Sequence, residues 1–201
     1  MRLKMYQEKV LDDLKRFLTL LEERQDIRTA YRTVWEEKGI RVNVSGQAGA
    51  YTKGSDGVEG KDYMPDYQET IPGVPRVCIK VPTGGGKTFL AANAIRPVFD
   101  SMSGNHPKAV VWLVPSDAIL KQTVKALQNR EHFYRRKIDM DFNGAVEVYT
   151  KEELMNGQNF SPVSVMENLS VFVLSYDSFR TSKKEGRKSF QGNGALLFFS
   201  R

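Results

Sequence analysis

A short apolar run that leads through a glycine-rich turn into a helical segment most restricts the possible folds of this chain. The run VCIKV (77–81) has the composition of a buried strand, the turn is PTGGGKT (82–88), and TFLAANAIRPVF (88–99) has helical periodicity. Glycines let backbone N–H groups come close to a phosphate, and the start of a helix adds partial positive charge. This strand, turn and helix predict a P-loop that binds a nucleoside triphosphate.

Two side chains of the turn carry expected chemistry. The ammonium group of Lys87 can reach the β- and γ-phosphates, and the hydroxyl of Thr88 is suited to ligate Mg²⁺. We therefore take Lys87 and Thr88 as candidate catalytic residues, Thr88 as the metal ligand, and ATP with Mg²⁺ as cofactors. The full P-loop pattern places a glycine at position 81, where this chain has Val81. A glycine-rich turn with an incidental lysine is the alternative, and the expected strand and helix argue against it.

Strands and helices alternate along the rest of the chain. Apolar runs at 109–115, 145–150 and 171–175 predict three further strands, and 116–128 predicts a helix for which Ser116 and Asp117 suit the first turn. This alternation indicates an α/β fold with a mostly parallel sheet flanked by helices. Residues 5–24 predict an amphipathic helix and 29–38 a weaker one.

Three segments follow from these patterns. Residues 1–38 form an N-terminal helical segment, residues 39–75 a connector rich in glycine and proline, and residues 76–201 a partial nucleotide-binding domain. Within the connector, 40–44 and 50–53 are compatible with a short hairpin.

Composition excludes several classes of protein. Cys78 is the one cysteine, so there is no internal disulfide and no zinc site built from cysteines. No apolar run of about 18 residues occurs, and the N-terminus carries charges every few residues, so we expect no membrane span, no secretory signal and a cytoplasmic location. The net charge is +6, to which residues 1–75 contribute −1 and residues 76–201 contribute +7. A basic second part is compatible with a phosphate-rich partner.

Four segments carry a resemblance to superfamily 2 helicases and translocases. VPTGGGKT (81–88) resembles their first motif, and Gln7 at the head of the first expected helix resembles their adenine-reading glutamine. VVWLVPSDAILKQT (110–123) resembles the motif in which a strand ends at a proline and the next helix holds a nucleic-acid phosphate. VFVLSYDSFR (171–180) resembles a later strand that ends in another nucleic-acid contact. Taken as a whole, the sequence is most similar to that of the motor subunit of type III restriction enzymes.

The resemblance implies a RecA-like P-loop NTPase that hydrolyses ATP while acting on DNA. Its partners would be duplex DNA and a methyltransferase or specificity subunit, with no membrane. Residues matching the family's nucleotide contacts are Gln7, Thr83, Gly84, Gly85, Gly86, Lys87 and Thr88. Those matching its nucleic-acid contacts are Pro115, Ser116, Ser175 and Tyr176.

The family pattern also has an apolar strand that ends in Asp-Glu, and this chain has none. We therefore expect an incomplete first lobe, the N-terminal part of a longer motor, without ATPase activity of its own. Asp177 is an alternative magnesium ligand. Because Ser175 and Tyr176 separate it from the apolar run, we favour a solvated loop aspartate.

Two other functions stay open at this point. One is a P-loop kinase or transport-type ATPase with no nucleic-acid partner, and the other is a non-catalytic nucleotide sensor or scaffold. DNA-stimulated ATP hydrolysis by the complete protein separates the motor from both. The basic sets 135–137 and 183–188 could line a nucleic-acid channel, although solvated loop charge is the favoured interpretation of the first.

Overall fold

The computed structural model describes residues 2–43, 63–102, 104, 106–156, 160, 161 and 163–176. The chain divides into two compact units, which we call the N-terminal unit (residues 2–82) and the C-terminal unit (Thr83 onward). Each unit is described by itself.

Two helices make up most of the N-terminal unit. Helix α1 (Met5–Arg24) buries one apolar face, and α2 (Ile27–Glu37) follows after a short turn. The turn forms because Gln25 takes a left-handed conformation and Asp26 caps α2 by accepting a hydrogen bond from the Thr29 N–H at 2.7 Å. Both predicted helices are confirmed. The core of this unit contains Leu11, Leu14, Phe17, Leu18, Leu20, Ile27, Ala30, Val42 and Tyr67.

Two short strands complete the N-terminal unit. Strand β1 (Arg41–Asn43) pairs with β2 (Tyr63–Pro65) in parallel, with Val42 opposite Met64. The partner of β1 in the described residues is therefore β2, and the predicted hairpin between 40–44 and 50–53 stays a prediction. The second half of that hairpin, 50–53, lies outside the described residues.

An ion pair links α2 to Asp66, the residue that follows β2. The guanidinium of Arg32 donates from Nη2 to Asp66 Oδ2 at 3.0 Å and to Oδ1 at 3.2 Å, and the Tyr67 N–H donates to the same carboxylate. Burial acts to raise the pKa of Asp66, but these hydrogen bonds and the charges of Arg32 and Arg28 outweigh it, so the pKa is lowered.

This ion pair predicts an acid-sensitive N-terminal unit. Because the pKa of Asp66 is lower in the folded state, its contribution to stability is present above the ordinary aspartate pKa and is lost as pH falls below about 4. Asp66→Asn should remove on the order of 1 kcal/mol at neutral pH and flatten the acid limb of a thermal-melting profile. An unchanged profile would contradict the role of Asp66. Asp12→Asn is the matched control, since its pair with Lys15 is exposed.

The predicted strand at 77–81 is not formed. The segment has no regular secondary structure, and the side chains of Val77 and Ile79 are 49% and 39% exposed. Its β-branched composition favours an extended backbone, but a strand also needs a neighbour for its N–H and C=O groups. Within the part of the chain that the structure describes, no strand pairs with 77–81.

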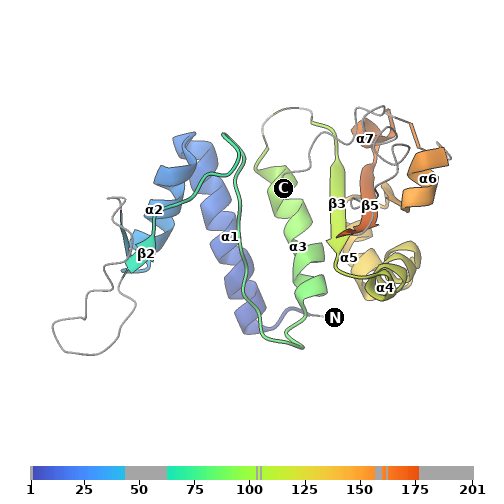
Figure 1. Cartoon of the computed structure of the whole chain (residues 1–201), viewed down its shortest axis with the longest axis horizontal. Helices are drawn as coiled ribbons and strands as arrows, with labels where there is room; N and C mark the ends of the chain where they lie inside the picture. Colours follow the sequence, from blue (N-terminus) through green and yellow to red (C-terminus); the bar gives the residue numbers. More distant parts are fainter. Residues whose placement is uncertain are drawn as a thin grey trace. The chain divides into compact units, whose positions relative to one another are not determined.

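A three-stranded parallel sheet is the centre of the C-terminal unit. Strand β5 (Leu169–Ser175) lies between β3 (Ala109–Val114) and β4 (Val146–Tyr149). The predicted parallel sheet with flanking helices is confirmed for these strands (Figure 1).

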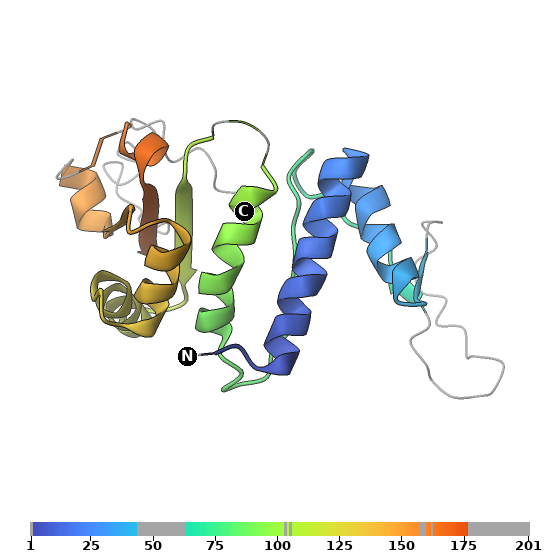
Figure 2. The same cartoon turned by 180° about the vertical axis from the view of Figure 1, so that it is seen from behind.

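Helices cover both faces of this sheet. On one face, Leu169, Val171 and Val173 of β5 pack with residues of α3 (Lys87–Asp100), α4 (Asp117–Gln128) and α5 (Phe133–Asp141). On the other face, Phe172 and Leu174 pack with α6 (Lys151–Asn156) and α7 (Ser164–Glu167). Figures 1 and 2 show α3 on one side of the strands and α6 and α7 on the other. Every residue of β5 is therefore buried.

Helix α5 corrects the interpretation of the first basic set. Residues 135–137 lie in this helix, not in a solvated loop, and Arg135 is only 4% exposed. Its guanidinium donates to the backbone oxygens of Leu127 at 3.1 Å and Val146 at 2.8 Å. Its Nε donates to the carboxylate of Asp139 at 2.8 Å. Arg135 thus joins the end of α4 and the start of β4, and it serves packing, not nucleic-acid contact.

No helix among the described residues is long and apolar enough to cross a bilayer.

Candidate nucleotide and nucleic-acid site

The glycine turn opens the C-terminal unit and passes directly into α3. Gly84 and Gly86 have φ angles of +76° and +74°, in the left-handed region that disfavours side chains, and Gly86 is the N-cap residue of α3. A Cβ on Gly84 would meet no atom within 4 Å, so there is open space beside the turn. The backbone of 83–86 can therefore curve around a bound group at the start of a 14-residue helix.

Lys87 and Thr88 are the first two residues of α3, with Lys87 exposed and Thr88 half-buried. An exposed ammonium and a hydroxyl at a helix start suit a triphosphate and its Mg²⁺. Among the described residues, no group of three His, Cys, Asp or Glu side chains could hold a metal ion alone. The donors present fit Mg²⁺ that arrives with a nucleotide, held by phosphate oxygens and Thr88.

A ring cluster supports the start of α3, and sequence reasoning missed it. Phe89, which follows Thr88, is 3% exposed, and its ring lies 5.8 Å from that of Phe133 and 6.4 Å from that of Tyr134. His132 caps α5 through its Nδ1, which accepts from the Tyr134 N–H, and stacks on Phe133 at 4.5 Å. The aromatic run HFY (132–134) was the available signal, but only tertiary contact shows that it steadies the helix of the glycine turn.

Gln7 lies in the first turn of α1, in the N-terminal unit. Its side chain is 1% exposed, and its Oε1 accepts a hydrogen bond from the Lys4 N–H at 2.9 Å. The predicted position at the head of a helix is confirmed, and the side chain there has a capping role that the sequence did not suggest. Reading of adenine by Gln7 stays a prediction.

The two predicted nucleic-acid segments lie at neighbouring strand ends. Val114 of β3 is paired with Ser175 of β5, so Pro115 and Ser116 follow one strand where Tyr176 follows the other. Ser116 is the N-cap of α4, with its Oγ 3.5 Å from the Ile119 N. Tyr176 is 54% exposed, whereas Ser175 is 3% exposed. The structure therefore brings an open helix start and an exposed aromatic ring to one edge of the sheet. Figure 1 shows α3 beginning at the end of the unit toward which β3 points.

Two predictions about this region fall outside the described residues. Asp177, the alternative magnesium ligand, and the basic set 183–188 are both among them.

Comparison with known proteins gives one decisive match. The model of the family described as "Type III restriction enzyme, res subunit" matches residues 1–199. The chain belongs to this family. The resemblance stated from the sequence is confirmed, and so is the RecA-like P-loop fold class. The res family is one of helicase-like motors that hydrolyse ATP. No curated protein and no solved structure matched the chain.

Proposed function

We propose that this res-family chain binds ATP with Mg²⁺ at the glycine turn and binds duplex DNA at the neighbouring strand ends. Within this proposal, the backbone of 83–88 surrounds the phosphates, Lys87 neutralises the β- and γ-phosphates, and Thr88 ligates Mg²⁺. Gln7 reads the adenine edge. The observation that carries the proposal is the pair of left-handed glycines that leads without interruption into α3.

The DNA part of the proposal follows from the register of the sheet. Pro115 and Ser116 would contact one phosphate through the amides at the start of α4, while Tyr176 offers an exposed ring beside them. Because no apolar strand ending in Asp-Glu occurs in the sequence, we propose that the chain by itself binds ATP without sustained hydrolysis. A methyltransferase subunit as a second partner also belongs to the proposal.

Calorimetric titration with a non-hydrolysable ATP analogue and Mg²⁺ tests the nucleotide part. We expect saturable binding with one site, weakened when Mg²⁺ is removed by a chelator. Fluorescence anisotropy with a labelled DNA duplex tests the other part, and DNA binding separates a motor from a kinase or transport ATPase. Absence of heat with the analogue would refute the nucleotide site.

A variant of Gly84 tests the geometry of the turn. Gly84→Ala introduces no clash, since nothing lies within 4 Å of its Cβ, but it places a side chain at φ +76°. That conformation costs an L-residue about 1–2 kcal/mol. The backbone of the turn should therefore move to a less strained conformation. Nucleotide affinity should fall, with little change in the melting temperature of the C-terminal unit. Gly144→Ala is the matched control, because Gly144 also has a positive φ and open space but follows α5. Equal loss of affinity in both variants would contradict the role of Gly84.

A further inference from the structure

The outward face of α4 carries a row of exposed cations. Lys121 and Lys125 are exposed and four residues apart, so they lie one above the other on the helix. The opposite face of α4 packs on the core through Thr123 and Leu127. Arg130, in the turn that follows α4, is also exposed. We call Lys121, Lys125 and Arg130 the α4 basic row.

These cations differ from others on helices of the same unit. Arg96 is paired with Asp100 and Lys137 with Asp141, each four residues away on the same helix. Within the described ranges, neither Lys121, Lys125 nor Arg130 has an ion pair or a hydrogen bond from its side chain. Their positive charge is therefore available to a partner.

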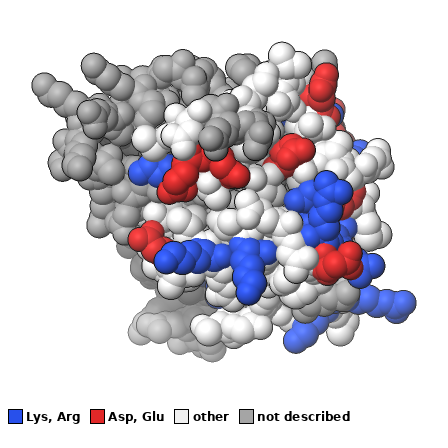
Figure 3. All heavy atoms as spheres, turned by 90° about the vertical axis from the view of Figure 1, so that its right-hand side faces the viewer, with Lys and Arg blue, Asp and Glu red and all other residues white. Residues whose placement is uncertain are grey.

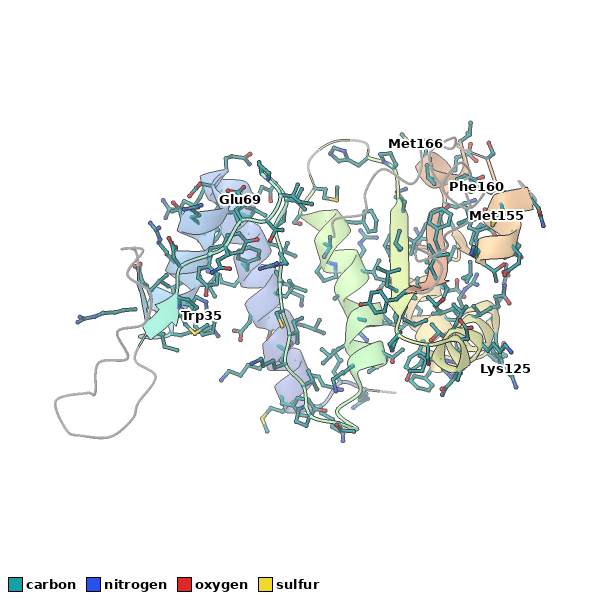
Figure 4. The ribbon with its side chains drawn as sticks, viewed as in Figure 1. Trp35, Glu69, Lys125, Met155, Phe160 and Met166 are labelled. Atoms are coloured by element: carbon teal, nitrogen blue, oxygen red, sulfur yellow. The ribbon has the colours of Figure 1, made fainter. Side chains whose placement is uncertain are left out.

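The surroundings of the row are mixed in sign. Two carboxylates border it: Asp117, four residues before Lys121, and Glu131, after Arg130. Figure 3, which shows this side of the C-terminal unit, has most of its Lys and Arg side chains in the lower half, with Asp and Glu side chains both among and above them. In Figure 4, Lys125 lies on the side of α4 away from the sheet.

We infer that the α4 basic row extends the nucleic-acid surface and binds the phosphate backbone of duplex DNA. This inference rests on the proposed function, because α4 begins at Ser116, where the first phosphate contact is proposed. From Ser116 to Lys125 the helix rises about 13 Å, at about 1.5 Å per residue. Duplex DNA carries one charge per about 1.7 Å of its axis, so a duplex held at the helix start and running along α4 presents phosphates to both lysines.

The test is DNA binding by the 201-residue chain at about 50 mM and about 200 mM salt. In K121Q/K125Q, both side chains stay long and helix-compatible while two charges are lost. At the higher salt concentration, we expect this variant to bind DNA about tenfold more weakly than the unsubstituted chain does. Its affinity should also depend less on salt, with a slope of log K against log salt that is shallower by about one to two. Asp117→Asn should have the opposite effect and raise the affinity for DNA a few-fold. General damage to the fold would not produce such an increase.

Matched controls separate the row from charge in general. K9Q/K15Q removes two exposed lysines from α1 and should leave affinity and slope near those of the unsubstituted chain. If the unsubstituted chain does not bind duplex DNA, the proposed function and the row fail together. If it binds and K121Q/K125Q binds equally, only the row is refuted. If K121Q/K125Q loses affinity only for an RNA duplex of the same sequence, the assignment of the row to DNA is overturned.

Discussion

Replacing Arg135 by alanine should destabilise the C-terminal unit by about 3–5 kcal/mol, the usual cost of removing one partner from a buried ion pair. The substitution leaves the backbone oxygens of Leu127 and Val146 without their donor and the carboxylate of Asp139 without its cation. It also opens a gap where α4, α5 and β4 meet. A fall in Tm of more than about 10 °C follows for a domain of this size.

Circular dichroism melting measures this effect, and the neighbouring residue is its control. Arg136→Ala removes an exposed guanidinium from the same helix and should change stability by no more than about 0.5 kcal/mol. Asp139→Asn keeps both backbone hydrogen bonds of Arg135 and should give an intermediate loss. If Arg135→Ala melts like Arg136→Ala, the hydrogen bonds of Arg135 do not stabilise the C-terminal unit.

Replacing Lys87 by alanine should raise the Kd for the ATP analogue roughly 10- to 150-fold, corresponding to the 1.5–3 kcal/mol of a hydrogen bond to a charged group. The lysine is exposed at the first position of α3, and alanine is the best helix former, so the fold should be unaffected. Loss of affinity with an unchanged Tm would therefore report the lost contact with phosphate.

Lys80→Ala is the matched control for this experiment. Lys80 is exposed and carries the same charge seven residues earlier, but it precedes the glycine turn. Its replacement should leave the Kd within about twofold. A Lys87→Ala chain that binds the analogue as tightly as Lys80→Ala would remove Lys87 from the site.

The sequence predicted best those elements whose patterns are local. The apolar spacing of α1, the cap at Ser116 and the β-branched runs of β3 and β5 each depend on residues close in the chain, and each is found. The glycine turn and the helix start at Lys87 were predictable for the same reason, because they are consecutive in the chain, whereas the roles of their side chains stay predictions.

Features that depend on pairing between distant segments were not predictable in this way. The parallel partnership of β1 with β2 crosses from Val42 to Met64, and nothing near either strand specifies it. The exposed segment 77–81 has strand composition without a strand neighbour. Arg135 was predicted to be a solvated charge, because only its contact with Val146, eleven residues away, gives its guanidinium a buried role.

The central strand β5 has a consequence for measurements of motion in this molecule. Its seven residues are buried between two apolar layers, and Ser170, Val171 and Phe172 are paired with both neighbouring strands. Its amide hydrogens should exchange with deuterated solvent only when the whole C-terminal unit opens. The exchange rate along Leu169–Ser175 is therefore an internal reference for global unfolding of this unit. Faster exchange at the glycine turn or at Tyr176 then reports local movement.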